Sequence, residues 1–143
     1  MISFILAIIS GAAMSIQGVF NTRVTEKIGL WETTTIAQGS AFVLALILMF
    51  VVGKGNISEV KSVNKLYLLA GFIGVIITFT VIKTIGSLGP TCGISIILVS
   101  QLITAALIDY FGLFNSPKVN FSFNEFLGVA LMIAGIILFK WKH

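Results

Sequence analysis

The sequence predicts an all-α membrane protein with five transmembrane helices, and three observations support this fold class. Hydrophobic residues make up 57% of the 143 residues and charged residues only 10%, whereas soluble domains carry about 25% charged residues. The apolar residues are gathered into five long runs, and a helix needs about 20 such residues to cross a bilayer. Glycine, proline and asparagine punctuate the runs. In water such a chain would expose large apolar patches, so we expect one integral membrane domain over residues 1–143.

Each run is read as one helix, with approximate bounds 2–20, 34–52, 66–85, 93–114 and 124–141. The first lacks a basic leading segment and is longer than the roughly 7–15 apolar residues of a signal peptide, which predicts a retained helix. Gly53 follows the second run, and Pro90 is placed to open the fourth helix. Ser122 and Glu125 have the spacing of a capping box, so the fifth helix is expected to begin there.

The basic residues are almost evenly divided between the two sides of the membrane. Five spans would place Lys54, Lys61, Lys65 and Lys118 on the N-terminal side, and Arg23, Lys27, Lys140 and Lys142, with Lys83 nearby, on the other. Orientation follows an imbalance of Lys and Arg between loops. The near-tie therefore predicts dual topology; a fixed orientation set by the first helix is the alternative.

Several polar residues lie inside the apolar runs and share faces or depths. Ser10, Met14, Gln17 and Asn21 follow one another at steps of four, three and four residues, so they share one face of the first helix. Amides at such positions either hydrogen-bond between helices or line a polar cavity, and the sequence leaves both open. The residues expected to line a substrate cavity are Gln17, Asn21, Gln38, Gln101 and Thr104. Close helix packing is expected at Gly11, Gly18, Gly71, Gly74, Gly128 and Gly135.

Lys83 and Asp109 are the only ionisable residues well inside the expected spans, and we expect them to carry charge coupling. In an antiparallel dimer, Lys83 of one copy would reach the depth of Asp109 in the other. The alternative is that Lys83 extends its ammonium group to the lipid headgroups.

Other chemistries lack the residues they need. The only histidine, His143, is the last residue, so neither a catalytic triad nor a metal site of histidine, cysteine and carboxylate spacing is expected. The lone Cys92 excludes an internal disulfide. Nucleotide-binding glycine loops are absent from the sequence, and the basic residues form no stripe for nucleic acid. We therefore expect no enzyme activity, cofactor, metal or nucleic-acid partner.

At these positions the chain resembles the small YdcZ-like inner-membrane proteins of the drug/metabolite transporter superfamily. The resemblance covers nearly the whole chain and rests on Gly11, Gln17-x-x-x-Asn21, Gln38-Gly39, Gly71-x-x-Gly74, Gln101, Asp109-Tyr-Phe-Gly-Leu, Gly128 and Gly135. One departure is Ser100, where the family pattern often has glycine before the glutamine.

The resemblance implies a half-size transporter in the bacterial inner membrane that works as a dimer with antiparallel subunits. The partner would be a second copy of a dual-topology chain or an oppositely oriented paralogue. Four-helix multidrug exporters of the superfamily exchange protons for cations at a glutamate in the first helix. The expected first helix here has no acid, so that exchange does not carry over, and Asp109 is the candidate for coupling.

We therefore expect a subunit that exports a small organic metabolite or amphiphile by alternating access. The alternative is a structural or regulatory subunit that assembles with a larger partner, in which the amides would satisfy one another away from solvent. An ion channel fits less well, because a pore needs polar groups along its full length.

Overall fold

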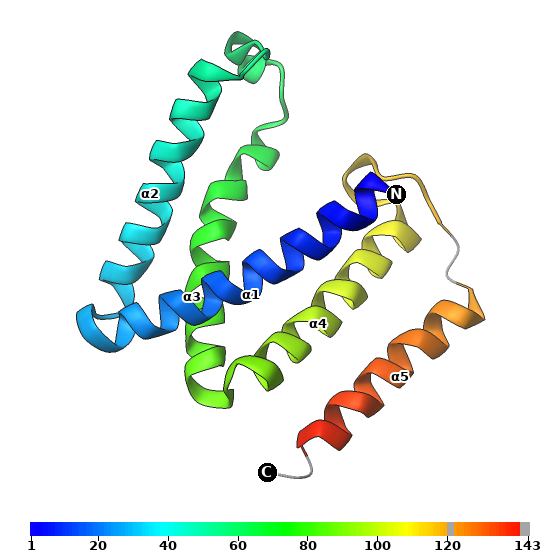
Figure 1. Ribbon diagram of the computed structural model, residues 1–143. Coiled ribbons are helices and arrows are strands. Elements are labelled where there is room, and N and C mark those ends of the chain that lie inside the picture. The colour runs from blue at the N-terminus through cyan, green and yellow to red at the C-terminus, as the bar shows by residue number, and fades with distance from the viewer. Residues whose placement is uncertain (120–121, 141–143) are drawn as a thin grey trace. The chain divides into compact units, whose positions relative to one another are not determined.

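The computed structural model describes residues 1–119 and 122–140, and this part of the chain is built from five α-helices and three short 3₁₀ helices (Figure 1). The helices are α1 (Ile2–Ile28), α2 (Leu30–Val51), η1 (Ile57–Lys61), η2 (Lys65–Leu69), α3 (Ala70–Leu88), α4 (Pro90–Phe111), η3 (Leu113–Asn115) and α5 (Phe123–Lys140). The all-α prediction is confirmed. Helices α1, α2, η2–α3 and α4 are long and apolar enough to cross a membrane. The apolar part of α5, Phe123–Leu138, is shorter, and its crossing remains a prediction.

The chain divides into two compact units, Met1–Gly86 and Ser87–His143. In the first unit, α1 and α2 are separated by the single residue Gly29. Its φ of 98° lies in the region that L side chains rarely adopt. The Gly29 N–H donates to the carbonyl of Thr25 (3.0 Å), and the Gly29 carbonyl accepts from the Thr33 N–H (3.2 Å). Because its backbone groups serve both helices, one glycine suffices to reverse the chain.

Helix α3 packs against α1 and α2 through small residues and aromatic rings. Gly18 of α1 lies so close to α3 that an added Cβ would stand 2.6 Å from Ile85 Cδ1 and 3.1 Å from Val81 Cγ1. Between α2 and α3, the rings of Trp31 and Phe79 stack with centroids 5.3 Å apart. These contacts use the C-terminal half of α1 and the N-terminal half of α2. Residues 1–14 and 39–52 are exposed throughout, which suits helices that meet lipid or another chain.

The second unit holds α4, η3 and α5. Pro90 lies in the first turn of α4, as the sequence predicts, and Gly112 ends the helix with a left-handed φ of 64°. At the start of α5, the Ser122 N–H donates to Glu125 Oε2 (2.6 Å), which is the glutamate half of the predicted capping box, while the Glu125 N–H donates to the Ser122 carbonyl (3.2 Å).

The helix boundaries differ from the predicted ones. Helix α1 ends at Ile28 rather than near Phe20, because Arg23, Glu26 and Lys27 in its last two turns are polar but good helix formers, and Arg23 pairs with Glu26 one turn away. The first helix therefore contains an acid, Glu26, contrary to expectation. Helix α2 begins at Leu30 instead of near 34, and α4 runs over Pro90–Phe111 instead of 93–114. Predicted features at 141–143, including Lys142 and His143, lie outside the described residues.

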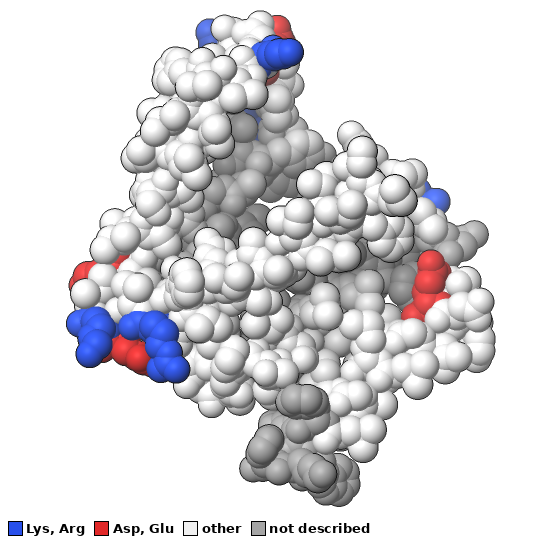
Figure 2. Space-filling model, in the orientation of Figure 1, with Lys and Arg blue, Asp and Glu red and all other residues white. Residues whose placement is uncertain are grey.

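Charged side chains of the first unit gather near the ends of its helices. Figure 2 shows them at the 54–65 loop and at the corner between α1 and α2, with uncharged surface along α2 between them. The corner carries the exposed side chains of Arg23, Glu26 and Lys27. A helix that spans a bilayer has an uncharged middle part in the hydrocarbon and charged residues near its ends.

Candidate functional site

The polar face of α1 contains an amide that the first unit leaves without a partner. Gln17 is exposed, and its side chain makes no hydrogen bond to any part of the chain that the structure describes. Asn21, one turn later, is half-buried, and it too has no side-chain hydrogen bond within residues 1–119 and 122–140. An amide in hydrocarbon is costly without a hydrogen-bonding partner. This face therefore needs water or another polar surface.

Gln38 is in a different situation, because α3 satisfies it. Its Nε2 donates to the carbonyl of Gly74 (3.0 Å) and to Thr78 Oγ1 (2.9 Å), while the Thr78 hydroxyl itself donates to the Gly74 carbonyl (3.0 Å). Gly74 lies directly against the amide, because a Cβ there would be in ordinary van der Waals contact with Gln38 Nε2, at 3.6 Å. Gln38 thus ties α2 to α3, the interhelical role that the sequence left open beside a cavity role.

In the second unit, Gln101 and Thr104 lie on α4. Thr104 Oγ1 donates to the Ser100 carbonyl of its own helix (2.8 Å). Gln101 is exposed, and its side chain makes no hydrogen bond with the residues described. Its amide therefore resembles that of Gln17. The prediction that all five polar residues share one cavity stays a prediction, since they are divided between the two units.

The two candidate coupling residues are both exposed. Lys83 lies near the end of α3 and Asp109 near the end of α4. The ion pair found in the described part of the chain joins Arg23 to Glu26 (3.1 Å), so neither candidate has a charged partner there. The main chain around Asp109 is well held, because its carbonyl accepts from the N–H groups of Gly112 (3.3 Å) and Val119 (3.0 Å). Pairing of Lys83 with Asp109 between copies remains a prediction.

The candidate packing glycines are of two kinds. Gly18 and Gly74 lie against neighbouring helices, at Ile85 and at Gln38 respectively. At the remaining four, an added Cβ would meet no described atom within 4 Å: Gly11, Gly71, Gly128 and Gly135. Their proposed packing roles need a surface that the units do not themselves supply.

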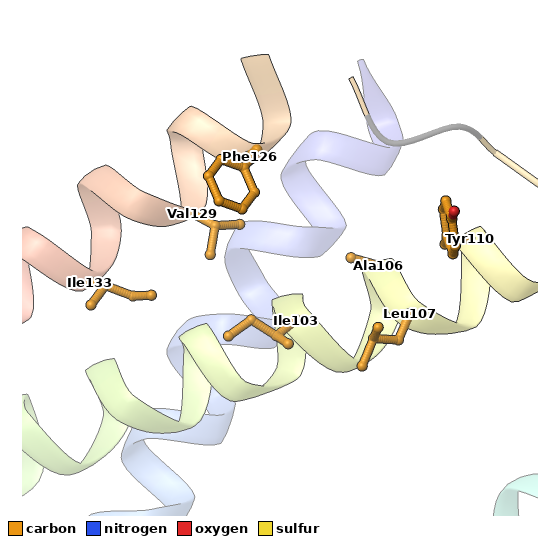
Figure 3. Close-up of a pocket in the computed structure, with 7 residues that line it drawn as sticks. All are labelled: Ile103, Ala106, Leu107, Tyr110, Phe126, Val129 and Ile133. Carbon is orange, nitrogen blue, oxygen red and sulfur yellow. The ribbon is translucent and has the colours of Figure 1, made fainter. Parts of the chain in front are cut away.

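A groove between α4 and α5 was not anticipated from the sequence. It has a volume of about 420 Å³ and is lined by Ile103, Ala106, Leu107, Tyr110, Phe126, Val129 and Ile133 (Figure 3). The side chains point toward one another from the two helices, and the Tyr110 hydroxyl is the polar group among them. Sequence reasoning passed over these residues because apolar side chains in a membrane helix carry no pattern that separates a groove from a lipid face. No group of three or more metal-ligating side chains occurs among the described residues.

These features define the class of the protein. The helices are long and apolar enough to cross a bilayer, and amide side chains lie within them. These are the features of an α-helical membrane protein that crosses the bilayer several times.

The comparison with protein families identifies which one. The model of the family described as "Putative inner membrane exporter, YdcZ" matches residues 2–138. The chain belongs to this family, which confirms the resemblance seen in the sequence. It is therefore an inner-membrane protein of an exporter family and not an enzyme. No curated protein and no solved structure matches it.

Proposed function

We propose that the chain is a half-size transporter subunit that exports a small organic metabolite or amphiphile by alternating access as an antiparallel dimer. The observation that carries this proposal is the unpartnered amide of Gln17. Gln17 lies near the middle of the long apolar helix α1, where an amide with no partner is costly. A water-filled cavity removes that cost and provides hydrogen bonds for a substrate.

The dimer is supported by how little each unit buries. The first thirteen residues of α1, which include Gly11, and the last thirteen of α2 are exposed. In transporters, sites form near the midplane between inverted repeats. A chain of this length supplies one repeat, and a second copy or a paralogue in the opposite orientation supplies the other.

The groove between α4 and α5 supports the amphiphile among the candidate substrates. Seven side chains line it, and the hydroxyl of Tyr110 is its polar group. Such a lining suits the hydrocarbon portion of an amphiphile.

The second candidate function, a structural or regulatory subunit, is favoured by Gln38. Its amide is satisfied by Gly74 and Thr78, as expected where polar residues only hold helices together. The two candidates differ in whether the face of α1 that carries Gln17 meets water.

Cysteine accessibility decides between them. Single cysteines replace Gln17, Asn21 and, as a matched control on the same helix, the exposed Ile16, which lies about 100° around the helix from Gln17, all in a Cys92→Ser background. A membrane-impermeant thiol reagent is applied from each side of sealed vesicles in turn. We expect Gln17→Cys and Asn21→Cys to react from both sides at rates at least about tenfold above Ile16→Cys.

Reaction of Gln17→Cys as slow as that of Ile16→Cys would refute a solvated cavity and favour the structural subunit. Reaction from one side alone would refute alternating access. Cross-linking of Gly11→Cys between copies, in membranes with both orientations present, tests the antiparallel dimer. Its absence, with cross-linking to another protein instead, would point to a heteromeric partner.

A further inference from the structure

The segment between α2 and α3, residues 53–69, is a structured loop rather than a plain connection. It contains two 3₁₀ helices, η1 and η2. Each is capped by an asparagine: Asn56 Oδ1 accepts from the Ser58 N–H (3.1 Å), and Asn64 Oδ1 accepts from the Leu66 N–H (3.0 Å). These caps hold the side chains of both turns in defined directions.

One side of this loop is apolar and exposed. Residues three apart coincide on a 3₁₀ helix, so Ile57 and Val60 share a side of η1. Ile57 is 73% exposed and Val60 44%. The series continues at the same interval with the exposed side chains of Val63 and Leu66. An ordered turn with aliphatic side chains held outward needs an apolar surface to cover them.

The same loop is basic. It carries three lysines, Lys54, Lys61 and Lys65, and one acid, Glu59. Glu59 is two residues from Ile57, so the three-residue repeat of a 3₁₀ helix places it on a different side of η1, and its Oε2 accepts from the Ser62 hydroxyl (3.4 Å). Aliphatic side chains beside a cluster of lysines are typical of a segment lying in the plane of a membrane with anionic lipids.

The position of the loop agrees with this chemistry. It follows α2 and leads into the apolar segment Lys65–Leu88, and both are long enough to span the bilayer, so the loop lies at the boundary between hydrocarbon and water. Ile57 also lines a hollow of about 460 Å³ together with Met49 and Phe50 from the last turn of α2. The apolar side of η1 is therefore continuous with the apolar end of a spanning helix.

We propose that residues 53–69 form an in-plane membrane anchor that binds anionic phospholipid. Ile57 and Val60 insert at the headgroup–acyl boundary, and Lys54, Lys61 and Lys65 bind the lipid phosphates. The anchor fixes the depth of the α2 and α3 ends. It is independent of the substrate and of the transport cycle.

The test places an environment-sensitive fluorophore on single cysteines in the Cys92→Ser background. Ile57→Cys and Val60→Cys probe the apolar side, and Ser58→Cys is the matched control on the neighbouring side of the same turn. The full-length protein is reconstituted in vesicles of phosphatidylcholine with about one-third phosphatidylglycerol. We expect blue-shifted emission at 57 and 60 and iodide quenching about threefold weaker than at 58, since anchors of this kind insert several ångströms.

The contribution of charge is tested at the same probe. Replacing Lys54, Lys61 and Lys65 together by glutamine is expected to raise iodide quenching at position 57 toward that at 58, whereas Lys27→Gln with Lys83→Gln leaves it unchanged. Should the triple variant fail to fold, raising the salt concentration on the unsubstituted loop produces the same loss through screening.

Equal quenching at 57 and 58 would overturn the anchor. Protection that is as strong in pure phosphatidylcholine would overturn its anionic specificity. Protection accompanied by disulfide formation between Ile57→Cys copies, in a parallel unlabelled sample treated with a thiol oxidant, would show that a second copy, and not lipid, covers the loop.

Discussion

The hydrogen bonds of Gln38 allow the tie between α2 and α3 to be measured. Gln38→Met keeps the length of the side chain and removes both donated hydrogen bonds, to the Gly74 carbonyl (3.0 Å) and to Thr78 Oγ1 (2.9 Å). Hydrogen bonds between membrane helices average about 0.6 kcal/mol each, so two bonds contribute about 1 kcal/mol.

The larger cost of leaving a buried group unpaired does not apply here. After the substitution, the Thr78 hydroxyl still donates to the Gly74 carbonyl (3.0 Å), so neither acceptor group is left without a hydrogen bond. We therefore expect Gln38→Met to lower the free energy of unfolding by about 1 kcal/mol, about fivefold in the unfolding equilibrium.

Reversible unfolding in bicelles, followed by steric trapping, provides the measurement. A double-mutant cycle of Gln38→Met with Thr78→Val is expected to give a coupling energy of about 0.6 kcal/mol. Gln17→Met is the matched control, because the Gln17 side chain is exposed and has no hydrogen bond within the described residues. Its effect on stability should stay within about 0.5 kcal/mol.

Two results would refute this reasoning. A coupling energy of zero between Gln38 and Thr78 would mean that the two side chains do not interact in the membrane. A loss at Gln17→Met as large as that at Gln38→Met would mean that Gln17 has a partner of similar strength, contrary to the solvated cavity.

Three further predictions concern glycines and a cap. Gly18→Leu should lower the free energy of unfolding by about 1–3 kcal/mol, because a Cβ alone would stand 2.6 Å from Ile85 Cδ1. In the control, Gly11→Leu, an added Cβ meets no described atom within 4 Å, so the monomer should lose less than about 0.5 kcal/mol. Equal losses in the two variants would contradict the α1–α3 contact. Gly89→Ala should cost about 1 kcal/mol from backbone strain alone, since φ is 76° and the Cβ meets open space; thermal unfolding of the purified variant measures it, and an unchanged midpoint would argue against this turn. Glu125→Ala should speed hydrogen exchange of the backbone amides in the first turn of α5 by about two- to fivefold. Glu125→Gln keeps an acceptor oxygen and should leave the exchange rate unchanged. Equal exchange rates in the two variants would count against the cap.

The helices could be predicted because the bilayer demands them. A run of apolar residues in hydrocarbon must satisfy its backbone within the segment, so composition and run length lead directly to helices. The cap at Ser122 and Glu125 and the position of Pro90 are equally local, since each depends on groups a few residues apart.

The boundaries were less predictable where polarity and helix formation disagree. Arg23, Glu26 and Lys27 signalled the end of an apolar run, but not the end of a helix, and α1 continues through them to Ile28. Gly29 alone makes the turn, although a longer connection was expected there. Hydropathy along the sequence indicates which residues lie in the hydrocarbon. The end of the helix depends instead on where the backbone leaves helical dihedral angles, which happens at Gly29.

By itself, the sequence determined that this protein is an all-α membrane protein and which polar residues lie within its helices, because both follow from local composition and helical spacing. Only the tertiary structure decided which of those residues are satisfied. Gln17 and Gln38 are alike as amides in apolar helices, yet Gln38 meets Gly74 and Thr78 on α3 while Gln17 is left exposed. The physical reason is that a hydrogen bond between helices depends on how two helices are placed, and residues 36 and 40 positions away in the sequence carry no local signal of that placement.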